Sequence, residues 1–327
     1  MRIVFMGTPT FAVPTLQQLL KTEFSVVGVV CQPDRASGRG KKVQVGPVKA
    51  LALSQNIPVV QPEKMKDPKF LGTLRAWDPE VVVVAAFGRI LPKPILDLPP
   101  KGCLNVHGSL LPKYRGAAPI QWAVIQGEVK TGVTIMLMDE GMDTGAILQQ
   151  EVIPIGAEET SGELAPRMAQ VGADLLVRTL RGWVADIITP LPQNDLAATL
   201  APILTKQDGL MSWDRPARSL ANRIRGLSPW PGVYTFLEDE RWGIWKVQVE
   251  DHEPDMRHSP HGTPQSPGTI TAVTKQAIRV QTGQGSLNLL EIQPENKKRM
   301  YVSDYVAGHR VTVGMTFSMG KGDDSAV

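Results

Sequence analysis

The sequence predicts an α/β protein in which a mostly parallel sheet domain is followed by a smaller C-terminal β-barrel. Up to about residue 188, short apolar runs typical of strands alternate with segments of helical spacing, which favours parallel strands joined by helices. After residue 206, short alternating strands separated by Gly, Pro and Asp turns replace that pattern, and their spacing suits a small barrel. The length of 327 residues, 42% of them hydrophobic, is enough to bury two cores.

The same change of pattern predicts the domain boundaries. Residues 189–205 carry three prolines and show no periodicity, which is typical of a connection between domains. We therefore expect a first domain at 1–189, a linker at 190–205, the barrel at 206–317 and a flexible tail at 318–327.

Composition narrows the classes of function. The 35 Lys and Arg residues against 32 Asp and Glu give a net charge of only +3, so any contact with a nucleic acid must come from local clusters. Cys31 and Cys103 sit in apolar surroundings without a C-x-x-C spacing, so we expect buried free thiols in a reducing compartment. A strand already begins at residue 2 and no apolar run reaches the length of a membrane span, so we expect a cytoplasmic protein without a signal peptide.

The elements of the first domain follow from the spacing of apolar residues. Residues 2–6 form an apolar run that stops at a Gly-Thr-Pro turn, after which apolar residues recur at helical spacing up to residue 20. The run VVVVAAF at 81–87 fits a central parallel strand covered on both faces. Further strands are expected at 26–31, 57–60, 102–107 and 132–139, an edge strand at 147–155, a loop at 32–42, and helices at 47–55 and 119–126.

The last helix of this domain begins with a capping signal. Thr160 followed by Glu163 matches a capping box, which opens a helix expected to run to about residue 188. Pro166 lies within its first turns and predicts a kink or a later start, because proline cannot donate the helical hydrogen bond.

The second domain is predicted from residue 206 onward. One amphipathic helix is expected at 216–225, and the segment 253–267, rich in Pro, His and Ser, is expected to be a disordered loop. Short strands are expected at 234–236, 242–249, 268–273, 277–281, 286–292 and 310–316.

Polar or glycine-rich loops follow the strands of the first domain. In open parallel sheets, ligands bind beyond the carboxyl ends of the strands. The sequence therefore predicts one crevice formed by the loops at 7–8, 32–42, 88–91, 107–112 and 140–145.

The sharpest candidates for chemistry are Asn105, His107 and Asp143. Asn105 and His107 are separated by one residue, so both side chains point to the same face of an extended strand. A histidine suits proton transfer near neutral pH, a nearby carboxylate can orient it, and an amide can donate to a developing oxyanion. Any one of these residues taken alone is more commonly a satisfied polar group at the end of a strand. Together they indicate acyl transfer to an amine without a covalent enzyme intermediate.

A basic loop is the second candidate site. Arg35, Arg39, Lys41 and Lys42 lie among glycines, which allows the cations to reach phosphates and base edges. The alternative is a solvated surface loop, the usual meaning of a charge run. Its place beside the predicted crevice favours binding.

Several classes of site lack their motif. The first strand is not followed by G-x-G-x-x-G, and no G-x-x-x-x-G-K-[ST] occurs, which disfavours a nicotinamide dehydrogenase or a P-loop enzyme. The spacing of His252, His258 and His261 matches no closed ligand set, so no metal site is predicted.

Two motifs resemble those of the 10-formyltetrahydrofolate-dependent formyltransferases. The first is N-V-H-G-S-L-L-P at 105–112, and the second is D-E-G-M-D-T-G at 139–145, which contains Asp143. Within this superfamily, the chain resembles the enzymes whose acceptor is a charged initiator tRNA, through FMGTP at 5–9, QPDR at 32–35, YRGAAPIQ at 114–121 and WPG at 230–232. The similarity covers residues 1 to about 317. It departs at 43–46, at Ser228 where Asn is expected, and at an apparent insertion at 253–267.

The resemblance implies a Rossmann-like first domain and an OB-like barrel. We also expect a monomer and no metal. The resemblance implies that tetrahydrofolate contacts Ser109, Leu110, Leu111 and Pro112, with a pterin pocket lined by Phe87, Gly88, Ile90, Leu91, Met138 and Asp139. It also implies that Arg39 especially, with Arg35, Lys41 and Lys42, enters the acceptor stem of the tRNA, and that the barrel binds its outer side.

On this hypothesis, the methionyl amine attacks the formyl carbon while Asn105 and His107 stabilise the oxyanion. Asp143 would hold His107 and help move the amine proton. Two alternatives remain open. One is a formyltransferase or formyl-folate hydrolase whose acceptor is a sugar amine or water, against which the basic loop and the barrel argue. The other is a non-catalytic RNA-binding protein built on this fold, which has no use for the three residues.

Overall fold

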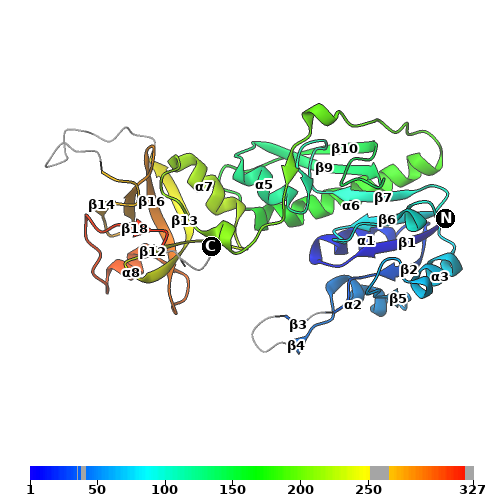
Figure 1. Ribbon diagram of the computed structural model, residues 1–327, viewed down its shortest axis with the longest axis horizontal. Coiled ribbons are helices and arrows are strands. Elements are labelled where there is room, and N and C mark those ends of the chain that lie inside the picture. Colours follow the sequence, from blue (N-terminus) through cyan, green and yellow to red (C-terminus); the bar gives the residue numbers. More distant parts are fainter. Residues whose placement is uncertain (35, 38–41, 251–264, 321–327) are drawn as a thin grey trace, which may run out of the picture. The chain divides into compact units, whose positions relative to one another are not determined.

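The computed structural model describes residues 1–34, 36–37, 42–250 and 265–320, which belong to two compact units (Figure 1). The first unit comprises Met1–Ile120, Lys130–Ile155 and Glu163–Pro202, and the second comprises Gln121–Val129, Gly156–Gly162 and the chain from Ile203. The described residues do not include Arg35, Arg39 and Lys41, most of the segment 253–267, or residues 321–327 of the expected tail. The domain boundaries expected from the sequence stay a prediction.

A seven-stranded sheet forms the centre of the first unit. Its order is β10-β9-β7-β6-β1-β2-β5, which Figure 1 shows from one edge to the other. The five strands from β5 to β7 are parallel to one another, and β9 is antiparallel to both of its neighbours, β7 and β10. The prediction of a mostly parallel α/β sheet is therefore confirmed. The strands are β1 Arg2–Gly7, β2 Ser25–Val30, β5 Val59–Val60, β6 Val81–Ala85, β7 Cys103–His107, β9 Lys130–Leu137 and β10 Ile147–Pro154.

The order of the strands contains a topological switch point. From β1 the chain runs outward through β2 to β5 and then returns to β6 on the other side of β1. Such a switch point opens a crevice at the carboxyl ends of the two strands. Strand β1 ends there at Gly7, and strand β6 ends at Ala85.

Helices cover both faces of this sheet. On one face, Cys103 of β7 packs in a core cluster with residues of α3 Pro68–Trp77 and α4 Lys93–Leu96. On the other, Gly172 of α6 Ser161–Val184 approaches Val106 so closely that a Cβ atom would lie 2.9 Å from its side chain. Because side chains alternate along a strand, Asn105 and His107 share the face of Cys103. The remaining helices are α1 Val13–Leu19, α2 Pro47–Ser54 and α5 Pro119–Ile125, with the 3₁₀ turn η1 at Thr10–Ala12.

Three local expectations differ from the structure. Helix α3 was not predicted, although Asp67 caps it by accepting from the Lys69 amide at 2.9 Å; Pro68 and Gly72 weaken its pattern. Helix α6 begins at Ser161 and continues through Pro166, so the later start is wrong. The expected loop at 32–42 contains part of a short hairpin, β3 Ala36–Ser37 with β4 Lys42–Val43.

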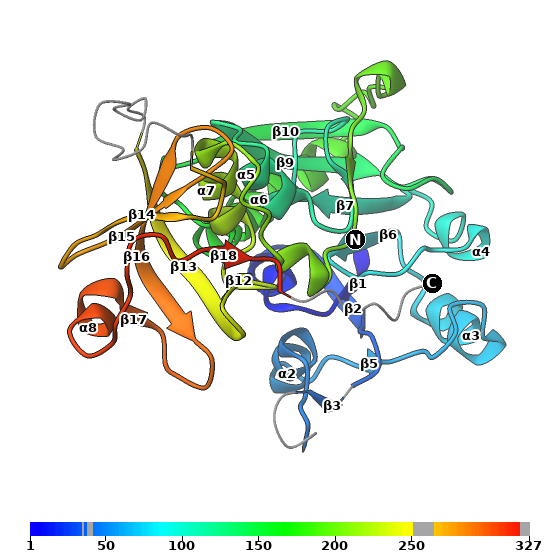
Figure 2. The same ribbon diagram turned by 60° about the vertical axis from the view of Figure 1, so that its left-hand side comes forward.

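The second unit contains a curled antiparallel sheet, which confirms the OB-like barrel (Figure 2). The order is β14-β15-β16-β13-β12-β18, and β17 pairs with β16. A bridge between Thr269 and Thr316 joins the two ends of this sheet around buried side chains such as Trp242 and Leu289. The elements are α7 Ala217–Gly226, β12 Val233–Leu237, β13 Glu240–Glu250, β14 Ile270–Val273, β15 Ile278–Gln281, β16 Ser286–Pro294, β17 Met300–Tyr301, α8 Val302–Val306 and β18 Phe317–Ser318, after the 3₁₀ turn η3 at Gln207–Gly209.

The strand expected at 310–316 is wrong. The chain turns at Gly314, whose φ is 94°, and only from there does its backbone bond to Ile270; a bridge at Thr316 and strand β18 follow. Val313 is exposed and has no place in the barrel core. No helix within the described part of the chain is both long and apolar enough to cross a membrane.

Candidate active site

The structure brings Asn105, His107 and Asp143 together at the end of β7. The Asp143 carboxylate lies 3.6 Å from His107 Nδ1 through Oδ2, and its Oδ1 lies 3.5 Å from Asn105 Nδ2. The His107 and Asp143 side chains are only 6% and 16% exposed, so solvent screens their interaction weakly. The contact between His107 and Asp143 is an ion-pair distance, longer than a hydrogen bond.

The second ring nitrogen of His107, Nε2, has a partner of its own. His107 Nε2 lies 3.0 Å from the carbonyl oxygen of Tyr114. A carbonyl oxygen only accepts, so Nε2 must donate. Nε2 is therefore committed to the Tyr114 carbonyl, and Nδ1 is the nitrogen that faces the carboxylate of Asp143.

Asp143 is held in an unusual backbone conformation. Its φ is 54°, and that of Tyr114, which bonds His107, is 61°. A left-handed residue other than glycine costs on the order of 1–3 kcal/mol and persists only where its surroundings hold it. Asp143 Oδ2 accepts from the Gly116 amide at 2.8 Å, and this bond orients the carboxylate toward β7.

The loop at 109–112 is fixed from β9 and β10. The Ser109 hydroxyl is fully buried and donates to the Lys113 carbonyl at 2.6 Å. Thr134 donates to the Ser109 carbonyl at 2.7 Å and accepts from the Leu111 amide at 3.1 Å. Gln150 donates to the Leu111 carbonyl at 2.9 Å. The Ser109 hydroxyl thus serves the loop itself, while Leu110 and Pro112 are half-buried.

The residues expected to line a pterin pocket differ in burial. Phe87 and Leu91 are 2% exposed and belong to the core, which Met138 also contacts, whereas Ile90 is 72% exposed. Gly88 has a φ of 69°, and Gln32 braces this turn by donating to the Phe87 carbonyl at 2.6 Å.

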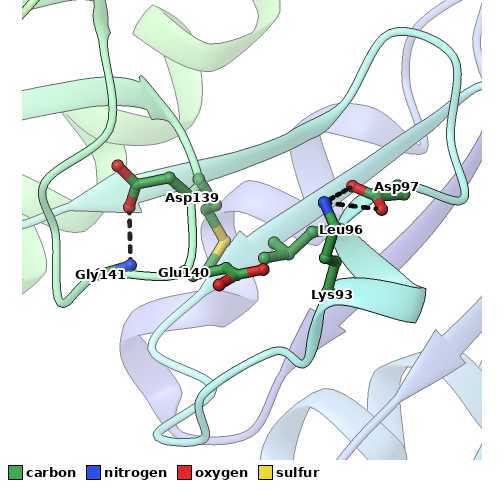
Figure 3. A pocket seen from close by; sticks show the side chains of 7 residues that line it. Lys93, Leu96, Asp97, Asp139, Glu140 and Gly141 are labelled. Carbon is green, nitrogen blue, oxygen red and sulfur yellow. Dashed lines mark hydrogen bonds and ion pairs between the residues drawn. The ribbon is translucent and has the colours of Figure 1, made fainter.

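A hollow of about 530 Å³ lies between helix α4 and the segment after β9 (Figure 3). The ion pair between Lys93 and Asp97 stands on one side, and Asp139, Glu140 and Gly141 stand on the other. Asp139 accepts from the Gly141 amide at 3.0 Å and from Thr144 at 2.7 Å, which fixes the turn that leads to Asp143. Met138 and Asp139 are the two expected pterin contacts that line this hollow.

The start of the basic loop is anchored by an ion pair. Lys49 Nζ of α2 donates to Asp34 Oδ2 at 2.5 Å and to Gln61 at 2.6 Å, and Gln61 donates to Asp34 Oδ1 at 2.9 Å. Hydrogen bonds from Lys49 and Gln61 lower the pKa of Asp34 below its ordinary value, against the effect of burial. Of the four expected tRNA contacts, only the backbone of Lys42 is described, in β4.

The sequence does not mark the residues that support the loop at 109–112 and the backbone of Asp143. Thr134, Gln150 and Gln193 reach the site from other parts of the chain, and no local motif marks them. Cys31 and Cys103 are free and buried, and burial raises the pKa of each thiol to about 12, so neither is a ready nucleophile. Within the residues that the structure describes, no His, Cys, Asp and Glu side chains are grouped to hold a metal.

Comparison with protein-family models gives two matches. Residues 1–180 match the model described as formyl transferase, and residues 203–310 match that of the formyl transferase C-terminal domain. A methionyl-tRNA formyltransferase of Syntrophus aciditrophicus (strain SB) is 49% identical over 313 residues, 95% of this chain and 97% of the relative. Another, of Synechococcus sp. (strain JA-2-3B'a(2-13)), is 51% identical over 322 residues, 97% of this chain and 98% of the relative.

Solved structures show the same fold at low identity. WlaRD, a sugar 3N-formyl transferase crystallised with dTDP and 5-N-formyl-THF, superposes with a TM-score of 0.65 at 18% identity over 91% of this chain and 99% of its own. HypX from Aquifex aeolicus in complex with tetrahydrofolic acid gives a TM-score of 0.58 at 14% identity over 96% of this chain and 50% of its own.

Proposed function

Because this chain belongs to the formyl transferase family, we propose that it transfers the formyl group of 10-formyltetrahydrofolate to the α-amine of methionyl initiator tRNA. The convergence of Asn105, His107 and Asp143 at a strand end carries the chemical part of this proposal. The similarity to methionyl-tRNA formyltransferases across both units supports the acceptor. The product serves translation initiation.

In this reaction, Asn105 and His107 stabilise the negative charge that develops on the formyl oxygen. Nε2 of His107 is committed to the Tyr114 carbonyl, so Nδ1 is the nitrogen that serves the reaction. Nδ1 of His107 and Nδ2 of Asn105 both lie beside the carboxylate of Asp143. In this proposal they are the two hydrogen-bond donors to the formyl oxygen of a substrate bound next to that carboxylate. Asp143 orients the ring and takes up the proton that the attacking amine loses. When the tetrahedral intermediate collapses, the bond between the formyl carbon and N10 breaks, and that proton passes to N10, so that tetrahydrofolate leaves.

The residues near the hollow fit a folate, which brings an activated formyl group to the site. A pterin needs apolar walls together with a few polar groups that read its ring edge. Met138 and Leu96 offer apolar walls, and Asp139 with the backbone near Gly141 offers polar groups. Ser109, Leu110, Leu111 and Pro112, with Phe87, Gly88, Ile90 and Leu91, complete the proposed contacts. No metal is required by this mechanism.

The acceptor is bound by the basic loop and the barrel. Arg35, Arg39, Lys41 and Lys42 contact the acceptor stem in this proposal. In the second unit, cations lie over aromatic rings: Arg241 is 4.1 Å from the centre of Tyr234, and Arg299 is 5.0 Å from that of Trp245. Arg299 is also ion-paired with Glu291, so Arg241 is the one of these two cations that the proposal assigns to the polynucleotide. The protein acts as a monomer in the cytoplasm.

The proposal is tested by formyl transfer from 10-formyltetrahydrofolate to charged initiator methionyl-tRNA, with charged elongator methionyl-tRNA, an amino sugar nucleotide and water as parallel acceptors. We expect rapid transfer to initiator tRNA and little to the others. Transfer chiefly to the amino sugar or to water would overturn the acceptor but keep the chemistry. Binding of tRNA without any transfer would support an RNA-binding protein instead.

A further inference from the structure

Residues 191–201 cross the edge of the first unit and return to its active-site loops. At one end, Leu191 pairs with Ile147 of β10 through two backbone hydrogen bonds of 2.8 and 2.9 Å. At the other, β11 Leu200–Ala201 pairs with β8 Arg115–Gly116. Between them lies a 3₁₀ turn, η2 Asp195–Ala197. The sequence alone predicts only a linker for most of this stretch.

Gln193 uses both ends of its amide in this crossing. Its Nε2 donates to the carbonyl oxygens of Asp143 at 2.8 Å and Gly145 at 2.7 Å. Its Oε1 accepts from Arg115 Nε at 3.1 Å and Nη2 at 2.8 Å. Because Arg115 is a pure donor, it fixes which way the amide points.

Arg115 is itself held in place. It is 7% exposed, and its Nη2 also donates to Asp195 at 2.7 Å. The chain of contacts therefore runs from Asp195 through Arg115 and Gln193 to the backbone of Asp143, whose φ of 54° needs such support.

Thr199 supports the other partner of His107. Its hydroxyl accepts from the Tyr114 amide at 2.9 Å, and its carbonyl accepts from the Arg115 amide at 2.8 Å. Tyr114 has a φ of 61°, and its carbonyl accepts from His107 Nε2. The segment thus ends on the two strained residues that touch the two nitrogens of one imidazole ring.

We propose that residues 191–201 form a positioning strap for the reaction, in which Gln193 acts through Asp143 and Thr199 acts through Tyr114. The inference rests on the proposed function, because it takes Asp143 and His107 as the reacting groups. Neither Gln193 nor Thr199 needs to touch a substrate. A strap of this kind affects the rate of the bound complex more than the affinity for either substrate, since it sets the geometry of groups that act in the transition state.

Gln193→Met tests the strap, because it keeps the length of the side chain and removes every hydrogen bond. We expect kcat to fall about 10- to 100-fold, the usual cost of losing a supporting contact, with KM for both substrates within about threefold. Amide hydrogen exchange at Gly116 and at 143–145 should accelerate, because Asp143 Oδ2 accepts from the Gly116 amide. The control is Gln170→Met on the exposed face of α6, which should change neither kcat nor the rate of amide exchange.

Gln193→Glu is the second variant, in case the first fails to fold. It keeps an acceptor for Arg115 but sets an oxygen against the two carbonyl groups, so the same fall in kcat and the same faster exchange are expected. Thr199→Val, which acts through Tyr114, should also lower kcat and accelerate amide exchange, but by less.

The outcomes separate the strap from the proposed function. A kcat within twofold of wild type together with unchanged exchange in a folded Gln193 variant would overturn the strap. A variant that is only less stable to heat, with normal kcat at low temperature, would do the same. If the wild-type protein transfers no formyl group, the proposed function fails, while unchanged exchange at Gly116 would still refute the strap.

Discussion

The carboxyl ends of β7 and β2 lie in the same sheet but present their polar groups in different ways. At the end of β7, Asn105 and His107 belong to the strand itself, and Asp143 is carried to them by a strained turn. At the end of β2, the ion pair of Asp34 with Lys49 joins the following connection to helix α2, and the cations of the basic loop come after it. The first arrangement fixes three side chains at one point, whereas the second fixes only the base of a loop.

This difference suits two tasks. Chemistry needs groups held to within a fraction of an ångström, which a strand end and its supporting hydrogen bonds provide. Contact with a large acceptor needs side chains that extend from the protein surface, and a loop with an anchored end provides them. Substitutions at the two ends should therefore have separable effects on rate and on acceptor affinity.

The largest effect is expected at the end of β7. His107→Ala removes a donor to the developing charge and the group that Asp143 orients, so kcat should fall about 10²- to 10⁴-fold. Thermal unfolding should show a folded protein. Under saturating charged tRNA, the matched change His309→Ala in the second unit should leave kcat nearly unaltered. Near-normal turnover by the His107 variant would refute its assignment.

Much of the β7 end is predictable from the sequence. The apolar run before Asn105 and the spacing to His107 indicate a strand with both side chains on one face, and β7 ends at His107 as expected. The first five residues of the run at 81–87 likewise form the central strand β6, because a covered strand needs only hydrophobic side chains.

The supporting contacts at this end are not predictable in the same way. Gln193 meets Asp143 across 50 positions of the chain, and Thr134 meets Ser109 across 25. Polar contacts at such separations depend on how loops close in three dimensions, and they leave no period in the sequence. The sequence of the strap therefore predicts only a linker, and no pattern in the sequence marks the ion pair of Lys49 with Asp34 at the base of the basic loop.

A second prediction concerns the loop beyond the β2 end. Arg39→Ala should lower kcat/KM for charged tRNA about tenfold, the range expected for losing one good contact to a base or phosphate. Binding of the folate should remain unchanged, and the dependence of tRNA affinity on salt should become shallower. Titration of each substrate separately measures this. An equal loss for tRNA and folate would mean that the substitution disturbs the whole crevice.

A smaller effect is expected at the base of that loop. Lys49→Met leaves the carboxylate of Asp34, whose side chain is 19% exposed, without its cation. The free energy of unfolding should fall by about 1–2 kcal/mol, and KM for tRNA should rise a few-fold with kcat unchanged. The control is Lys101→Met, which breaks an ion pair with Asp186, 79% exposed, and should cost little in urea unfolding. A fall in kcat instead would contradict the separation of the two strand ends.

The smallest effect is the pH dependence of that same pair. Lys49 and Gln61 lower the pKa of Asp34 in the folded protein, so its charged form stabilises the fold at a pH above the ordinary value of an aspartate. This contribution is lost as the pH falls through the lowered value, because the carboxylate then takes up a proton in the folded state as well. The difference in unfolding free energy between wild type and Asp34→Asn should therefore stay constant, at about 1 kcal/mol, from pH 7 to 5 and shrink below about pH 4. Urea unfolding at a series of pH values measures it. A difference that grew on acidification would mean that the surroundings of Asp34 destabilise its charged form, which would contradict the anchoring of the loop by Lys49 and Gln61.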